Sequence, residues 1–198
     1  MSNGVRTPIG TLAFPHFFEP KKRAENKEPE YHGILIFDAE AQASPEFQEL
    51  KSAVIAACNE KWPSGKPNGF KSPFRKADDV GGDGKSRVDK YDGFNPGDIF
   101  ISPWSKYPPG VVGPALQDLI QSDVFAGQKA RFTVSPFAYS INGNVGVGLM
   151  VNNVQITSMN EERLDGRDPK ADFDAVEQPA DTAAAQDSNT EYDEDLGI

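Results

Sequence analysis

Cysteine and histidine are scarce in this chain of 198 residues, which contains only Cys58, His16 and His32 of these two types. One cysteine cannot form a disulfide within the chain, and the three residues do not have the spacing of a zinc site. They also offer no nucleophile–base pair for covalent catalysis. We therefore expect a protein that is not an enzyme and that holds no metal or other cofactor. Cys58 is expected to be a buried, inert thiol, and the histidines to be structural or surface residues.

Long apolar runs are also missing. No segment approaches the roughly 20 consecutive apolar residues of a membrane-spanning helix. Residues 1–4 lead into neither the charged start nor the apolar centre of a signal peptide. These absences predict a soluble protein of the cytoplasm that has no membrane partner.

Positive charge is scarce at one end of the chain. Residues 158–198 contain 3 Lys or Arg and 13 Asp or Glu, whereas residues 1–157 contain 17 of each kind. The body is therefore neutral, and the C-terminal segment carries the entire net charge of −10. A segment with so much self-repulsion and so few large apolar residues cannot bury enough surface to offset its chain entropy. The sequence thus predicts one domain over residues 1–157 and a flexible acidic tail over residues 158–198.

The clearest local signals predict one helix and a terminal hairpin. Ser44 is an N-cap type of residue, Pro45 suits the first helical position, and apolar residues then recur at helical spacing until Pro63. Further along, residues 129–139 and 145–156 have strand character. Asn142 and Gly143 between them are a typical hairpin turn.

Weaker signals add more strands and a long loop region. Residues 7–14, 31–37 and 99–101 are runs of strand length, and Pro15 is expected to end the first of them. Residues 63–97 are rich in proline and glycine and are expected to form loops. A short helix is predicted over residues 114–121, with three residues facing inward: Leu116, Leu119 and Ile120.

Several strands around one dominant helix predict a mainly β fold, an OB-like small β-barrel with long loops. Another α+β arrangement remains open. A loop region as long as residues 63–97 is uncommon unless it is functional.

Cations and aromatic rings alternate in this loop region. Between Lys61 and Lys76 there are five cations, three aromatic rings and no carboxylate. Single-stranded nucleic acid presents phosphates to cations and unstacked bases to rings, and each stacked base contributes roughly 1–3 kcal/mol. The alternative is that the rings are core residues beneath the loops and the lysines a solvated face. For Phe137 and Tyr139, stacking on bases and filling the barrel are both open.

Three stretches carry a family resemblance: residues 7–21, Phe137–Tyr139 together with residues 146–147 and 151–155, and Lys71–Lys76. They resemble the start, the C-terminal hairpin and the basic loop of a phage family of OB-fold single-stranded-DNA-binding proteins, formerly a domain of unknown function. The resemblance implies a non-catalytic protein of the host cytoplasm that coats single strands without sequence preference in replication, recombination or repair. The tail is similar to the acidic tails of other replication single-strand binders, although its end, residues 196–198, has no aromatic ring.

The resulting hypothesis is a basic, aromatic-lined groove that holds single-stranded DNA. The residues assigned to phosphates are Lys21, Lys22, Arg23, Lys71, Arg75, Lys76, Lys85 and Arg87. The residues assigned to base stacking are Phe74, Tyr91, Trp104, Tyr107, Phe137 and Tyr139.

The tail is expected to occupy this groove when DNA is absent. Once displaced, its end would bind replication or recombination proteins through Asp193, Glu194, Asp195, Leu196 and Ile198. An exposed strand edge would permit a homodimer. The alternatives are a protein-interaction or assembly factor that uses the loops and the tail and, less favoured, a DNA-modifying enzyme.

Overall fold

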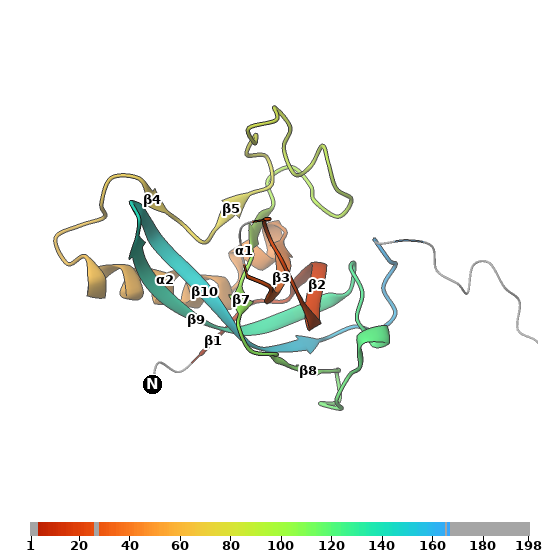
Figure 1. Ribbon diagram of the computed structural model, residues 1–198. Coiled ribbons are helices and arrows are strands. Elements are labelled where there is room, and N and C mark those ends of the chain that lie inside the picture. The colour runs from red at the N-terminus through yellow and green to blue at the C-terminus, as the bar shows by residue number, and fades with distance from the viewer. Residues whose placement is uncertain (1–3, 26–27, 165, 167–198) are drawn as a thin grey trace, which may run out of the picture. The chain divides into compact units, whose positions relative to one another are not determined.

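The computed structural model describes residues 4–25, 28–164 and 166, and it shows a mainly β protein with one long helix (Figure 1). Ten strands belong to one sheet. The elements in chain order are β1 (Val5–Arg6), β2 (Gly10–Lys21), β3 (Glu30–Phe37), α1 (Ala39–Ala43), α2 (Pro45–Lys61), β4 (Phe70–Lys71), β5 (Arg75–Lys76), β6 (Ile99–Ile101), β7 (Trp104–Ser105), β8 (Gly110–Val112), the 3-10 turn η1 (Gln121–Asp123), β9 (Lys129–Ile141) and β10 (Asn144–Ile156).

Five of the strands close into a barrel. β2 pairs with β3, β3 with β7, β7 with β10, β10 with β9, and β9 with β2, so the ladder returns to the strand where it started. The β7–β10 pairing is parallel and the other four are antiparallel. This closed, mainly β architecture with one main helix confirms the OB-like barrel that the sequence predicts.

The main hydrophobic core lies between the barrel strands and α2. Phe17 and Phe132 meet edge to face in it, with ring centroids 5.6 Å apart. α2 contributes a stripe at helical spacing, and its four members are at most 6% exposed: Phe47, Leu50, Val54 and Cys58. The helix begins as predicted, because the Phe47 N–H donates to Ser44 Oγ at 3.2 Å. Cys58 is a buried free thiol.

A second, smaller apolar cluster covers the outer face of β3. Its members are Ala13, Ile34, Ile36, Ala77, Phe94 and Phe100. Ala77 and Phe94 come from the segment of residues 77–98, here called the covering loop. Backbone hydrogen bonds hold this loop, since the Ala77 N–H donates to Asp98 O at 2.8 Å and the Arg87 N–H to Ala77 O at 3.0 Å. Part of the long loop region therefore completes the fold by burying β3 on both faces.

The prediction that Pro15 ends the first strand is wrong. β2 runs through Pro15 to Lys21, and its register against β3 shifts between Ala13 and His16. Proline cannot donate to a β-ladder, so it fits where the pairing is interrupted by a bulge. Phe14, just before it, has a φ of 49°. The continuation past Pro15 adds His16, Phe17 and Phe18 to this strand.

The short helix predicted over residues 114–121 is also wrong. The Leu119 N–H donates to Val111 O at 3.1 Å, and Val112 forms an isolated bridge with Asp118. These contacts fold the segment back on β8 as a turn. Leu116 has a φ of 64°, which is incompatible with a right-handed helix. Leu119 is buried as expected, but Leu116 and Ile120 are 70% and 66% exposed.

The contacts of the body continue beyond Thr157. Met159 packs against the main core, and the Leu164 N–H donates to Ala126 O at 2.9 Å. Residues 165 and 167–198 lie outside the described residues, so the acidic tail and its end stay predictions. Among the described residues, no helix is both long and apolar enough to cross a membrane.

Candidate nucleic-acid interface

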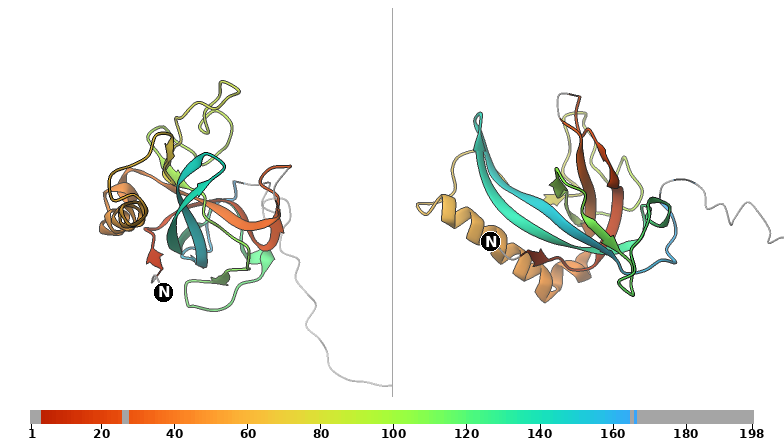
Figure 2. Two further views of the ribbon diagram at one scale, coloured as in Figure 1. Left: turned by 60° about the vertical axis from the view of Figure 1, so that its left-hand side comes forward. Right: turned by 60° about the horizontal axis from the view of Figure 1, so that its bottom comes forward.

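The hairpin of β9 and β10 extends beyond the barrel as a curved arm. Each strand has 13 residues, and the turn residues Asn142 and Gly143 have φ values of 49° and 75°, as a type I′ turn requires. β9 also pairs with β1 and β2 over residues 129–134. Figure 2 shows the hairpin bending away from β2 and β3 beyond this stretch. Residues 135–150, here called the hairpin arm, form one wall of a cleft.

Two glycines on the arm make room for two aromatic rings. Phe137 lies opposite Gly148 in the ladder, and Tyr139 lies opposite Gly146. A Cβ atom on Gly148 would lie 2.5 Å from the Phe137 ring, and one on Gly146 would lie 2.9 Å from the Tyr139 hydroxyl. The rings therefore lie across the partner strand. Both are half-buried, and both line the cleft.

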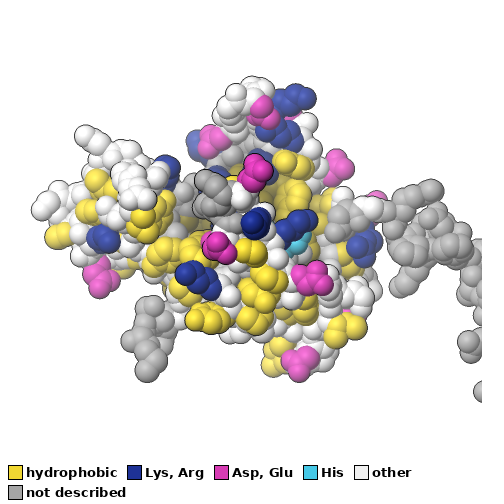
Figure 3. All heavy atoms as spheres, viewed as in Figure 1, with side chains coloured by type: hydrophobic (Ala, Val, Ile, Leu, Met, Phe, Trp, Pro, Cys, Tyr) yellow, Lys and Arg dark blue, Asp and Glu magenta, His cyan; other side chains and the backbone are white. Residues whose placement is uncertain are grey.

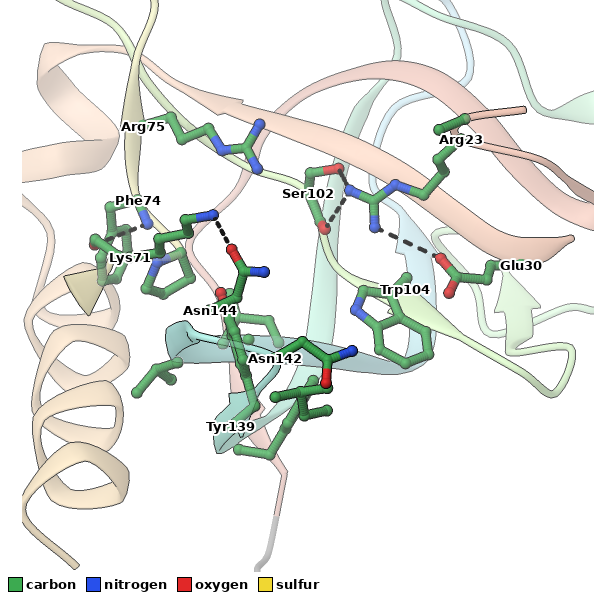
Figure 4. Close-up of a pocket in the computed structure, with 18 residues that line it drawn as sticks. Arg23, Glu30, Lys71, Phe74, Arg75, Ser102, Trp104, Tyr139, Asn142 and Asn144 are labelled. Atoms are coloured by element: carbon green, nitrogen blue, oxygen red, sulfur yellow. Dashed lines mark hydrogen bonds and ion pairs between the residues drawn. The ribbon is translucent and has the colours of Figure 1, made fainter. Parts of the chain in front are cut away.

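The cleft has a volume of about 980 Å³ and separates the hairpin arm from the segment around β5 and from the end of the β2–β3 hairpin (Figure 4). It brings together residues from distant parts of the sequence. Half of the predicted contact residues line it: Arg23, Lys71, Phe74, Arg75, Trp104, Phe137 and Tyr139. Its shape is open, which suits an extended chain better than a small molecule.

The rings form a row in the cleft. Tyr139 and Phe137 have centroids 6.3 Å apart, and Phe137 meets Trp104 edge to face at 5.9 Å. Phe74 belongs partly to the core, because its ring packs against Phe47 at 5.5 Å. Flat rings in a row can stack on successive bases of a single strand regardless of sequence.

Three cations stand beside this row. Lys71 Nζ donates to Asn144 Oδ1 at 2.6 Å, which ties β4 to the hairpin tip. Arg23 Nη2 donates to Ser102 Oγ at 2.8 Å, and the exposed Arg75 lies between them along the wall (Figure 4). Burial lowers the pKa of Arg23, whereas the Glu30 carboxylate acts in the opposite direction. An arginine keeps its charge under such a shift, so Arg23 still presents a positive charge to the cleft.

The structure places the other predicted contact residues outside the cleft. Arg87 and Tyr91 form their own group, with the guanidinium 5.2 Å from the centre of the Tyr91 ring. Tyr91 in turn meets Phe14 edge to face at 5.1 Å. The remaining five are exposed residues away from the cleft lining: Lys21, Lys22, Lys76, Lys85 and Tyr107.

Sequence reasoning missed several residues that shape the cleft. Ser102 and Asn144 orient two of the cations, and Glu30 adds a carboxylate to the wall. Gly146 and Gly148 could have been identified from the sequence, because they lie opposite the two rings once the hairpin is paired about Asn142–Gly143. Within the part of the chain that the structure describes, no group of three or more His, Cys, Asp or Glu residues could hold a metal ion.

The closed barrel and its cleft define an OB-like binding protein, whose open site offers rings in a row and cations along one wall. The chain belongs to the family described as the Enterobacter phage Enc34 ssDNA-binding protein, whose model matches residues 5–184. The sequence matches no curated protein.

Solved structures of phage proteins share the fold. The single-stranded DNA-binding protein of bacteriophage Enc34 in complex with ssDNA superposes with a TM-score of 0.65 at 13% identity, covering 83% of this chain and 90% of that one. The single-stranded DNA-binding protein gp2.5 of bacteriophage T7 gives a TM-score of 0.56 at 14% identity, covering 82% and 96%. At such identities the likeness concerns the fold.

Proposed function

We propose that this protein binds single-stranded DNA in the cleft, without sequence preference and without catalysis. The observation that carries the proposal is the row of Tyr139, Phe137 and Trp104 with cations along one wall. Bases stack on the rings, while Lys71 and Arg75 contact phosphates. Family membership supports the same ligand.

In this role the protein protects and organises exposed single strands during phage DNA replication, recombination or repair, in the cytoplasm of the host cell. The predicted contacts outside the cleft, such as Arg87 and Tyr91, serve only a strand long enough to leave it. The exposed edge of the sheet remains the proposed surface for a homodimer, which sedimentation at increasing concentration would reveal.

Tryptophan fluorescence tests the binding site directly. Trp104 lines the cleft, whereas Trp62 lies outside its lining and packs against Phe70 at 5.9 Å. The variant Trp62→Phe therefore retains only the cleft tryptophan, and its emission is expected to be quenched by oligo-dT. The matched variant Trp104→Phe, which retains only Trp62, should show little quenching. Quenching that follows Trp62 instead would contradict the proposed site.

The salt dependence of the same titration tests the electrostatic part. Neutralising phosphates releases counterions, so the affinity should fall steeply, by roughly tenfold or more, between low and moderate salt. An affinity that does not change with salt would exclude phosphate contacts as the main source of binding. Absence of binding at every salt concentration would favour the alternative of a protein-interaction or assembly factor.

The acidic tail has two proposed roles, which rest on its charge of 3 cations against 13 carboxylates. As a polyanion it competes with DNA for the cationic wall of the cleft. When DNA displaces it, its terminal residues become available to replication or recombination proteins.

A further inference from the structure

The row of rings in the cleft continues past Trp104 onto the barrel. In the β3–β7 ladder Trp104 lies directly opposite His32, and in the β2–β3 ladder His32 lies directly opposite His16. Side chains at opposite positions of antiparallel strands share one face of the sheet. The two imidazole rings are accordingly close, with centroids 4.8 Å apart. The row thus runs from Tyr139 at the arm to His16 on β2.

His32 keeps one ring nitrogen available. Its Nδ1 atom lies 2.9 Å from the backbone oxygen of Glu30. Because a carbonyl oxygen only accepts, Nδ1 carries the hydrogen, and Nε2 is the atom that can gain a proton. Among the described residues every buried side-chain N or O atom has a partner, and Nε2 of His32 has none in this part of the chain. This atom therefore contacts solvent.

His16 is the more accessible of the two histidines. It is half-buried and lines a smaller cavity of about 360 Å³, to which Lys21 also contributes. Figure 3 shows a histidine at the surface beside Lys or Arg side chains. The pair therefore has an open side that a ligand can reach.

The surroundings keep both imidazoles neutral in the free protein. Burial is the largest effect and lowers the pKa of each histidine, and the positive charge of Lys21 lowers both further. Arg23 acts in the same direction on His32, while Glu30 opposes the shift without reversing it. Gln121 and Val124 add only uncharged side chains to the cavity at His16. The charged residues that face the pair are Glu19, Lys21, Arg23 and Glu30.

We propose that His16, His32 and Lys21 form a phosphate subsite, over which the bound single strand continues beyond the cleft. The proposal rests on the proposed function, since the phosphate belongs to the strand held by the row of rings. A phosphate here offsets the repulsion from Lys21 and Arg23 and so favours the protonated imidazoles. On protonation, Nε2 of His32 becomes a donor to a phosphate oxygen, while Nδ1 keeps its bond to Glu30.

Binding at this subsite takes up protons, and this fixes the sign of its pH dependence. The affinity for the strand rises as the pH falls through the ordinary histidine range near 6.5. Each proton taken up changes the dissociation constant by at most about tenfold per pH unit. The dependence ends at low pH, where the histidines are already protonated without DNA.

The decisive measurement is the affinity for fluorescent oligo-dT at about pH 8 and about pH 5.5 at constant ionic strength, because thymine does not titrate between them. The wild type is expected to bind about tenfold more tightly at the lower pH. The double variant His16→Gln/His32→Gln is expected to lose the dependence, so that its affinity is the same at the two pH values. The control Glu28→Gln, at an exposed site outside the cleft lining, should retain it.

A wild type with equal affinity at the two pH values, or a double variant with an unchanged dependence, overturns the subsite. Intact binding at the higher pH in that case leaves the proposed function standing. Absence of binding at both pH values refutes the proposed function itself. If the double variant does not fold, His16→Gln alone is expected to lose part of the dependence.

NMR titration of the imidazole protons separates a phosphate ligand from a structural role. The pKa values of His16 and His32 should rise when oligo-dT is added, and unchanged values would overturn the proposal. Inorganic phosphate is the second ligand. A rise with phosphate alone supports a subsite that recognises the isolated group, whereas a rise with oligo-dT only supports one that needs the tethered strand.

Discussion

At the scale of single residues, Glu30 is the unexpected member of the proposed DNA-binding cleft, because it places a negative charge in the lining. Its carboxylate lies 3.8 Å from the guanidinium of Arg23, which Ser102 also holds. The pair is only partly exposed, with 24% of the Arg23 side chain and 16% of the Glu30 side chain accessible. Glu30 thus orients Arg23 in the free protein and repels phosphate at the same time.

Replacing Glu30 with Gln is expected to tighten binding to oligo-dT by about threefold to tenfold, since the repulsion disappears and Arg23 becomes available. The cost in unfolding free energy should be below about 1 kcal/mol, because a single ion pair of this length contributes little. Glu28→Gln is the matched control, with the same change of charge at an exposed site outside the cleft lining. Equal effects of the two substitutions would point to net charge alone.

Composition indicated residue types that line the cleft but could not show which individual residues do so. Phe137 and Tyr139 lie on the cleft face of the hairpin, whereas the ring of Phe74 also packs against Phe47 in the core. The histidines were expected to be structural or surface residues, and nothing local to either one shows that they stand beside Trp104. That neighbourhood comes from the pairing of β3 with β2 and β7.

At the scale of elements, the hairpin arm presents the rings, and its glycines decide how they lie. Gly148 lies opposite Phe137, and the Phe137 ring fills the space that a side chain at position 148 would need. The arm needs no other strand to define its register, because the two-residue turn sets the pairing. This is why residues 129–156 could be predicted so closely from the sequence.

Gly148→Ala is expected to push the Phe137 ring out of the row and to weaken oligo-dT binding, by about 1 kcal/mol or roughly fivefold. The new Cβ would lie 2.5 Å from the ring, so the ring has to move. Gly82→Ala is the control, since a Cβ there meets nothing within 4 Å. Thermal unfolding of both variants would show whether the fold is intact, and an unchanged affinity of a folded Gly148→Ala would contradict the stacking role of Phe137.

At the scale of the whole molecule, charge is divided between a neutral body and an acidic C-terminal segment. Three cations of the body, Arg23, Lys71 and Arg75, line the cleft, where they outnumber the single carboxylate, Glu30, among the described lining residues. The proposed competition between the acidic segment and DNA rests on this contrast, and the local concentration of a tethered polyanion would not depend on the concentration of the protein.

Ending the chain after Gly166 is expected to raise the affinity for oligo-dT severalfold at low salt and to have little effect at high salt, where the competition is screened. This end point keeps Met159 and Leu164, which pack against the body. Titrations of the full chain and the shortened chain at two salt concentrations measure the difference. The same affinity for both at low salt would refute the competition.

The sequence by itself determined the features that arise from neighbouring residues. The N-cap at Ser44 and the stripe on α2, the Asn142–Gly143 turn and the segregation of charge all follow from local chemistry, so they could be predicted without the fold. Local rules failed at Pro15, where the pairing of β2 with β3 continues past the proline, and at residues 114–121, where the segment folds back on β8 instead of forming a helix.

Only the tertiary structure decided which residues meet. Arg23 reaches Ser102 across 79 positions of sequence, and Lys71 reaches Asn144 across 73. Such contacts depend on strand pairing between distant segments, because β3 pairs with β6 and β7 on either side of Ser102, and β4 pairs with β10 beside the hairpin tip. This pairing brings a scattered set of rings and cations into one cleft, and it leaves Arg87, Tyr91 and Tyr107 outside.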